Sequence, residues 1–344
     1  MRKPALLVSA VAAVLVTSVA TSWAASFFVD PRNGAGATCT VTAPCDTLDA
    51  ALALAASGDT INILSPGNFG PICLDANIAI TGPSDNATIT FSATAPGVMS
   101  GGSHPNCPGT ATVAVQIAAG TGGTVKLKNL ILNNGGGTNG AVKVDSAFNV
   151  SMTNTVLRGG SGAISQMMTV ASSQGSQLQL FFNHCDIAFS GSGGGIAIAP
   201  SGATPMRVHF ANSEVHNAVF GLQVNATGLT GSADIAVAID STEFFSFNNS
   251  SVSVTATGAN QARVSVARST VLNTGGAALK FNGGNAFGAL YENVITGNSS
   301  GVNVIGGASV ATFQNNQIFG NGNNCAVNGA PTACTSALIS QAQN

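Results

Sequence analysis

The sequence predicts an all-β fold, a parallel β-helix whose N-terminal end is covered by one short α-helix. Three observations lead to this prediction. Short segments of alternating apolar and polar residues recur every 23 to 30 residues between residues 127 and 318. A second series of such segments follows the first at a separation of 10 to 13 residues. Beyond the first 24 residues, residues 48–55 carry the one convincing apolar pattern with helical spacing.

Residues 1–24 form a predicted signal peptide. Arg2 and Lys3 precede an apolar run, and the run ends in a small-residue cleavage signal at residues 22–24. We expect cleavage after Ala24 and a protein that is secreted, periplasmic or attached to the cell surface; an uncleaved anchor is the alternative. No later run reaches the ~18 apolar residues of a membrane span, so none is expected in the mature chain.

The charge of the chain argues against nucleic acid as a partner. Without Arg2 and Lys3, the 11 basic residues become nine against 13 acidic ones, a formal net charge of −4. Proteins that bind nucleic acid carry basic stripes instead. Only 7% of the residues are charged, against about 25% in ordinary globular domains. The surface must therefore be covered largely by uncharged polar residues.

Seven cysteines in an exported chain predict disulfide bonds with one thiol left over. Cys185 is expected to be that thiol, packed as a small hydrophobic residue. A metal site is the alternative, although no Cys-x-x-Cys or clustered Cys/His spacing is present. The expected disulfides are Cys39–Cys45, Cys73–Cys107 and Cys325–Cys334.

Residues 25–60 form the predicted N-terminal cap. Asp46 or Thr47 can cap a helix that ends at Gly58. The apolar face of this helix is expected to plug the open end of the β-helix, because terminal coils need covering. The Cys39–Cys45 bridge closes a short loop, so at most ~2–3 kcal/mol of stabilisation is expected from it. The residues on the apolar face are Leu48, Ala51, Leu52 and Ala55.

Residues 61–324 form the predicted coils, and residues 325–344 a C-terminal cap or tail. Two series that keep step over seven turns predict coils with strands at two fixed places. The first series centres on polar residues between apolar ones: Asn129, Asn154, His184, Asn212, Ser241, Arg268, Glu292 and Asn315. The second centres on apolar residues: Val142, Ile164, Ile196, Leu222, Val252, Leu279 and Val302.

Other repeat folds fit this pattern less well. Helical solenoids need a long amphipathic segment in each repeat, leucine-rich repeats need a fixed leucine pattern, and a propeller needs four strands per ~40 residues. Variable coil length suits a β-helix, because extra residues leave the stack as loops. Glycine is expected to supply positive φ at the corners, and stacked asparagines to satisfy the backbone there.

The stretch from Phe27 to Gly70, "FFVDPRNGAGATCTVTAPCDTLDAALALAASGDTINILSPGNFG", resembles the N-terminal region of bacterial exported proteins of the pectate-lyase-like superfamily. The resemblance continues as a pattern to about Asn324. It implies a right-handed parallel β-helix and export. It implies little about activity, since that superfamily contains lyases, hydrolases, epimerases and non-catalytic members.

One outward row of the predicted coils holds three consecutive carboxylates: Asp186, Glu214 and Glu243. Coils lie about 4.8 Å apart, which permits the carboxylate separations of both retaining and inverting glycosidases. Stacked like charges favour a bound cation, and calcium prefers such oxygen ligands. The predicted catalytic group is this row with His216 and Arg207, and the row is the candidate calcium site. A merely solvated surface is the alternative.

A second outward row lies on the strand before each polar centre. Outward aromatic and charged side chains there are the candidate sugar-binding residues. Beside Arg207 they are Phe181, His209, Asp240, Arg263 and Tyr291.

The expected function is engagement of an extracellular polysaccharide along one lateral face, by a binder, a lyase or a hydrolase. The competing hypothesis is a non-catalytic structural or adhesion module of the cell surface, which the low charge suits equally well. Catalysis stays open, because the sequence lacks the "D-D", "G-H-G", "R-I-K" and "R-x-P" motifs of pectin-degrading relatives. No cofactor other than calcium is expected.

Overall fold

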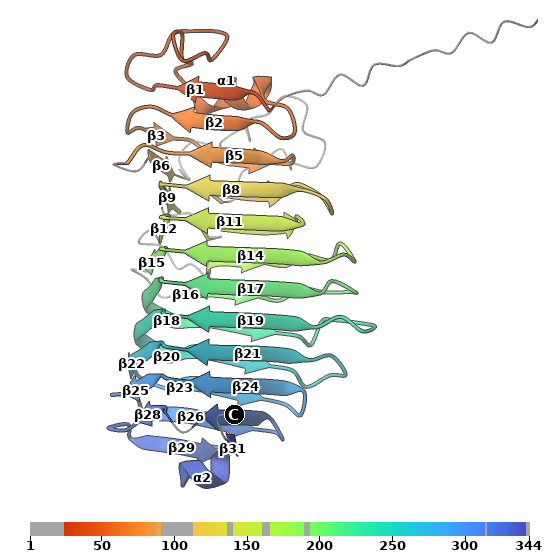
Figure 1. The fold of residues 1–344 in the computed structure, drawn as a ribbon, viewed down its shortest axis with the longest axis vertical. Coiled ribbons are helices and arrows are strands. Elements are labelled where there is room, and N and C mark those ends of the chain that lie inside the picture. Colours follow the sequence, from red (N-terminus) through yellow and green to blue (C-terminus); the bar gives the residue numbers. More distant parts are fainter. Residues whose placement is uncertain are drawn as a thin grey trace, which may run out of the picture.

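The chain forms a single solenoid in which each coil stacks on the preceding one (Figure 1). The strands nearest the viewer run to the left while the chain descends, so the coils turn clockwise as they recede from the N-terminal end. The predicted right-handed parallel β-helix is thereby confirmed. Residues 1–23, which hold nearly all of the predicted signal peptide, lie outside the described residues. The computed structural model describes residues 24–84, 87–90, 113–135, 140–159, 166–188, 193–313 and 315–341.

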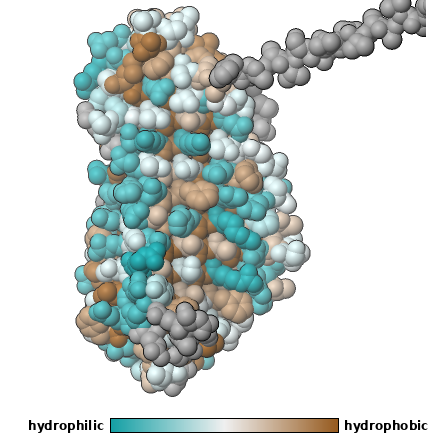
Figure 2. All heavy atoms as spheres, in the orientation of Figure 1, coloured by the Kyte–Doolittle hydropathy of each residue, from teal (hydrophilic) through white to brown (hydrophobic). Residues whose placement is uncertain are grey.

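Twelve of the described strands form one parallel sheet, which we call the front sheet because its outer face is toward the viewer in Figures 1 and 2. Each coil contributes one strand, and its neighbours come from the coils before and after. In order, the strands are β1 (Ser26–Val29), β2 (Thr60–Ile63), β5 (Ile78–Thr81), β8 (Thr124–Lys128), β11 (Asn149–Thr153), β14 (Leu178–Asn183), β17 (Met206–Ala211), β19 (Ile235–Asp240), β21 (Ala262–Ala267), β24 (Ala286–Tyr291), β27 (Ser309–Phe313) and β31 (Ile339–Gln341).

The other 19 described strands form the rest of the wall. A corner ladder follows the front sheet: β3 (Asn68–Phe69), β6 (Ala87–Thr90), β9 (Leu130–Asn133), β12 (Val156–Arg158), β15 (Asp186–Ala188), β22 (Thr270–Thr274), β25 (Val294–Thr296) and β28 (Gln317–Ile318). A back ladder comes next: β4 (Ile72–Leu74), β7 (Val115–Ala118), β10 (Val142–Ser146), β13 (Gln166–Val170), β16 (Gly194–Ile198), β23 (Ala277–Asn282), β26 (Ser300–Ile305), β29 (Asn323–Val327) and β30 (Ala330–Thr332). Two long strands belong to both ladders: β18 (Glu214–Asn225) and β20 (Glu243–Thr255).

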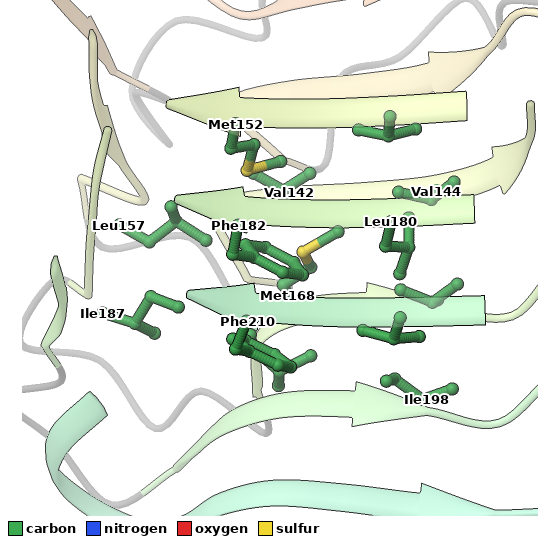
Figure 3. Packing of buried hydrophobic residues seen from close by; sticks show 14 of the residues in the cluster. Val142, Val144, Met152, Leu157, Met168, Leu180, Phe182, Ile187, Ile198 and Phe210 are labelled. Carbon is green, nitrogen blue, oxygen red and sulfur yellow. The ribbon is translucent and has the colours of Figure 1, made fainter. Parts of the chain in front are cut away.

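The core is a continuous apolar column enclosed by these three walls (Figure 3). Alternation along each strand sends every second side chain inward, and parallel pairing stacks equivalent side chains on successive coils. Phe182 on β14 and Phe210 on β17 lie in register and stack with ring centroids 4.5 Å apart and planes 6° apart. Leu157 and Ile187 enter the same column from the corner ladder.

The register of the back ladder corrects one expected strand. Val142 pairs with Met168, not with the expected centre at Ile164, which lies outside the described residues. In β13 both Met167 and Met168 are buried, so burial does not alternate there, as it also does not in β7 and β16 of the same ladder. The remaining centres stack as predicted: Ile196, Leu222, Val252, Leu279 and Val302.

Glycines with positive φ supply the turns before several front strands, as expected, at Gly120, Gly175, Gly202 and Gly231. The corners after the front strands are made by non-glycine residues. The residue there adopts a left-handed conformation, and its φ lies between 47° and 55°. Asparagine tolerates this conformation, and a single such residue costs only ~1–2 kcal/mol for other side chains. Asn154 also donates its amide to Asn129 Oδ1 of the preceding coil (2.8 Å), part of the expected asparagine stacking. The left-handed corner residues are Asn129, Asn154, His184, Asn212, Ser241, Arg268 and Glu292.

From the corner at Asn154 onward, the residue after the corner is polar or cysteine, points inward and forms a polar ladder inside the core. The N–H of Cys185 donates to Ser213 Oγ of the next coil (3.1 Å), and the N–H of Ser269 donates to Asn293 Oδ1 (3.0 Å). The ladder satisfies backbone groups that the bend leaves without a strand partner. Its members are Thr155, Cys185, Ser213, Thr242, Ser269, Asn293 and Asn316.

Cys185, the free cysteine among the described residues, therefore takes a place that serine or threonine holds in neighbouring coils. Its Sγ lies 3.4 Å from the carbonyl oxygen of Met152 and 3.7 Å from that of Asn183. Burial raises the pKa of the Cys185 thiol to about 11, so the thiol is protonated at neutral pH. The unpaired cysteine is thus part of the polar ladder rather than a reactive site.

We expect Cys185→Ser to leave the free energy of unfolding within about 1 kcal/mol of the wild type, since a hydroxyl can donate to the same carbonyls. Cys185→Val should lower it by about 1–3 kcal/mol, because those carbonyls then lose their donor. Urea unfolding of the two variants measures the difference. Equal stability of serine and valine at this position would contradict the ladder role.

The N-terminal helix α1 (Leu48–Leu54) lies at the end of the solenoid, as expected (Figure 1). Of the two expected caps, Thr47 is the one used: the N–H of Ala50 donates to its Oγ1 (3.3 Å). The helix ends at Leu54 and not at Gly58, because the backbone of Ala55 is already extended. Gly58, with φ 105°, instead shapes the turn before β2. The buried residues of the helix are Leu48, Ala51 and Leu52.

Two of the three predicted disulfides are present in the described residues. Cys39–Cys45 holds the chain before α1, and Cys325–Cys334 joins β29 to the short helix α2 (Cys334–Ala337). Cys73 is disulfide-bonded too, and its predicted partner Cys107 lies outside the described residues. Disulfides of this kind fit an oxidising extracellular compartment. No helix within the described ranges is both long and apolar enough to cross a membrane.

Candidate functional site

The outer face of the front sheet is hollowed across β14, β17, β19, β21 and β24. The open groove, which we call the front groove, has a volume of about 470 Å³. Figure 2 shows this face, with a hydrophobic strip along the solenoid axis between hydrophilic side chains. The floor is made of small side chains: Ala236, Ala238, Ser265, Gly288 and Ala289. The larger side chains that line it are Phe181, Arg207, His209, Arg263 and Phe287.

Two arginines on one side of the front groove share a single carboxylate. Arg207 lies on β17 and Arg263 on β21, with the small residue Ala236 of β19 between them. Arg207 Nη1 lies 2.9 Å from Asp234 Oδ1, and Arg263 Nη1 lies 3.2 Å from Asp234 Oδ2. Arg263 also hydrogen-bonds Gln261. The three charged groups keep a net charge of +1 at the edge of an apolar floor.

Aromatic side chains stand at both ends of the front groove along the axis. Phe181 on β14 meets His209 on β17 edge to face, with ring centroids 6.4 Å apart. Phe287 stands on β24, next in register to Arg263. These rings are about half-buried. Four strand spacings separate β14 from β24, roughly 19 Å. The groove thus offers ring contacts at two ends and cations along one side.

Two other predicted binding residues lie at the ends of the front strands and are already engaged. Asp240 forms an ion pair with Arg268, Nη2 to Oδ2 2.6 Å. Tyr291 contacts Phe313 edge to face, with centroids 5.8 Å apart. A hydrogen bond to Glu292 and the charge of that carboxylate raise the pKa of the Tyr291 phenol. Neither Asp240 nor Tyr291 lines the front groove.

The predicted acidic row exists. Asp186 on β15 pairs with Glu214 on β18, and Glu214 pairs with Glu243 on β20. The row lies on the corner ladder. Glu214 is exposed and Glu243 about half-buried, and neither makes a side-chain hydrogen bond or ion pair with the described residues.

His216 is held by its neighbours on both ring nitrogens. Nε2 lies 2.9 Å from Asp186 Oδ1, and Nδ1 lies 2.8 Å from Asn217 Nδ2. Its ring stacks on Phe245 of the next coil, with centroids 4.6 Å apart and planes 4° apart. Of the predicted catalytic residues, the structure brings Asp186 and His216 into contact beside Glu214.

Arg207 does not join that group, which corrects the expected constellation. It lies near the start of β17, whereas Glu214 begins β18 only after the corner that ends the front strand. The guanidinium of Arg207 is bound to Asp234 and to the carbonyl oxygen of Met206. The basic and acidic candidates therefore lie on different walls of the solenoid.

The expected calcium site is not supported either. In the part of the chain that the structure describes, no group of three or more His, Cys, Asp and Glu side chains could hold a metal ion. Side chains of one outward row emerge from successive coils side by side and do not converge on a common point. The carboxylate of Asp186, moreover, already contacts the ring of His216. Asp186, Glu214 and Glu243 stack without forming a metal cage.

Sequence reasoning missed Phe287, which lines the front groove, and Asp234, which binds the two arginines beside it. Phe287 stands at the same outward position as Arg207 and Arg263, so extension of that row by one coil would have found it. Asp234 precedes β19 and falls outside the alternating pattern, so the sequence holds no signal for it.

Comparisons with known proteins give one likeness of fold. No protein-family model matches this chain, and no curated protein matches it. Among solved structures, the chain is similar to one described as the crystal structure of pectate lyase Pel9A. The two are 14% identical with a TM-score of 0.47, over 94% of this chain and 79% of that chain. The fold assignment itself stands on the strand register of this chain.

Proposed function

We propose that this protein binds an extracellular polysaccharide in the front groove, with the glycan chain lying along the solenoid axis. The observation that carries the proposal is the combination of an apolar floor, aromatic rings at both ends and a pair of arginines on one side. Aromatic faces pack against the C–H faces of sugar rings, and guanidinium groups donate paired hydrogen bonds to hydroxyls or carboxylates. A groove open along the axis suits a long ligand.

The chemistry of the groove favours binding over hydrolysis. Glycoside hydrolysis uses two carboxyl groups that flank the scissile bond. Two described carboxylates lie beside the groove, and both are already paired: Asp234 with Arg207 and Arg263, and Asp240 with Arg268. The acidic row with Glu214 lies on another wall, so it cannot act on a chain that lies in the groove. The net positive edge favours a carboxylated or sulfated glycan over a neutral one.

Affinity gel electrophoresis tests this function directly. The purified protein is run through gels that contain polygalacturonate, alginate or a neutral galactomannan, with an unrelated protein of similar charge as the reference. We expect at least one acidic polysaccharide to retard the protein and the galactomannan to have a smaller effect. Unchanged mobility in every gel would contradict the proposal and favour a structural module. New reducing ends or unsaturated products in the same mixtures would show cleavage in addition.

A further inference from the structure

A second hollow lies on the wall that carries the acidic row, away from the front groove. It has a volume of about 410 Å³ and opens where β18, β20 and β22 bend between the corner and back ladders. This volume falls in the range of about 300–1,000 Å³ that is typical of ligand pockets. We call it the amide hollow, and its lining is Asn217, Ala218, Ser246, Phe247, Asn248 and Asn273.

Three coils present a polar side chain at the same position of the amide hollow. Ala218, Phe247 and Thr274 lie in register, so the residues before them, Asn217, Ser246 and Asn273, stack along the axis. Their φ angles are 54°, 62° and 55°, a conformation in which short polar side chains are favoured. The regular bend therefore sets amide and hydroxyl groups at the spacing of the coils, about 4.8 Å.

These polar groups have free hydrogen-bonding capacity. Asn248 and Asn273 are exposed, and their side chains make no hydrogen bond with the described residues. Asn217 uses its amide nitrogen on His216, which leaves its carbonyl oxygen to accept. An asparagine side chain both donates and accepts, which matches neighbouring hydroxyl groups. The set is built to hydrogen-bond a polyhydroxylated molecule.

The charge around the amide hollow selects against anions. The lining contains no charged residue, and the carboxylates of Glu214 and Glu243 lie about 10 Å away on β18 and β20. No basic group forms an ion pair with either of them among the described residues. An anionic sugar would be repelled there, whereas a neutral sugar has no such penalty.

We propose that the amide hollow is a second carbohydrate site, specific for uncharged sugar units. It is independent of the front groove in position and opposite to it in charge preference. The protein would then hold an acidic chain on one face and a neutral sugar, free or as a branch of a glycan, on another.

Saturation-transfer-difference NMR with glucose, galactose, mannose, xylose and glucuronate as probes tests the site. We expect a signal from at least one neutral sugar and a weaker one from glucuronate. The double variant Asn248→Ala with Asn273→Gly removes two amides without strain, because glycine accepts the positive φ. This double variant should raise the dissociation constant of the neutral sugar at least tenfold. The control is Asn249→Ala with Asn328→Gly, a matched pair of substitutions outside the hollow, which should change the dissociation constant less than twofold.

One comparison separates this site from the front groove. Substitution of Arg207 and Arg263 by alanine should leave the neutral-sugar signal unchanged, whatever its effect on acidic polysaccharide. The melting temperature of each variant confirms that it is folded. The proposal is overturned if no neutral probe gives a signal, if the signal survives loss of Asn248 and Asn273, or if it disappears with the two arginines.

Discussion

Phe210→Ala is expected to lower the free energy of unfolding by about 3–5 kcal/mol. Phe210 is fully buried on β17 and stacks on Phe182 of the preceding coil. Its truncation removes the transfer free energy of the ring and leaves a cavity between coils whose backbones are fixed by their ladders. The stacking contact adds roughly 0.5–1.5 kcal/mol to what is lost. Urea unfolding followed by circular dichroism gives the change.

Phe181→Ala is the matched control, because Phe181 is the neighbour of Phe182 on β14 but points outward into the front groove. We expect it to change stability by less than about 1 kcal/mol. Hydrogen exchange should place the effect of Phe210→Ala in β14, β17 and β19, since each coil of a solenoid contacts mainly its neighbours. A loss below about 1 kcal/mol, equal to that of the control, would contradict the predicted stacked core.

The fold could be predicted because a solenoid repeats its signal. A single five-residue segment of alternating apolar residues is weak evidence for a strand. Eight such segments at a regular spacing predict both where the strands lie and how they stack along the axis. The stacking of Asp186, Glu214 and Glu243 was predicted correctly for that reason. The prediction failed at Met168, where two adjacent methionines are both buried and alternation gives no register.

Periodicity along the axis does not describe the cross-section of the coil. The sequence predicted which residues share a row, but not the angle between two rows. Arg207 and Glu214 are seven residues apart, yet a corner turns the chain between them and they occupy different walls. The left-handed corner at Asn212 causes this turn, and the axial repeat places the two rows on successive strands without setting the angle between them.

Phe181, Arg207, His209 and Arg263 were predicted and line the front groove, but the hollow between them was not predicted. The hollow exists because Ala236, Ala238 and Gly288 leave space between larger neighbours, and small side chains do not mark a site in a sequence. Small residues are common in this chain, which has 42 glycines, so their alignment carries no signal until the register is known. Only the strand register shows that these three small residues lie side by side and form the floor of the groove.

Substitution of both Arg207 and Arg263 by alanine is expected to weaken binding of acidic polysaccharide by at least about a hundredfold. A hydrogen bond to a charged group contributes roughly 1.5–3 kcal/mol, and each 1.4 kcal/mol is a factor of ten in the dissociation constant. The substitution also leaves Asp234, whose side chain is 21% exposed, without its partners. The added Asp234→Asn change removes that uncompensated charge, so the triple variant separates lost ligand contacts from lost stability.

Arg268→Ala is the control for the loss of positive charge, because Arg268 pairs with Asp240 at the end of the front strands and does not line the groove. It should change the dissociation constant less than threefold. Isothermal titration with the acidic polysaccharide that retards the wild type, at two salt concentrations, gives these values. Electrostatic binding should weaken with added salt in the wild type and depend less on salt in the triple variant. Equal losses in Arg268→Ala and in the double variant would show that overall charge, and not the geometry of the front groove, holds the glycan.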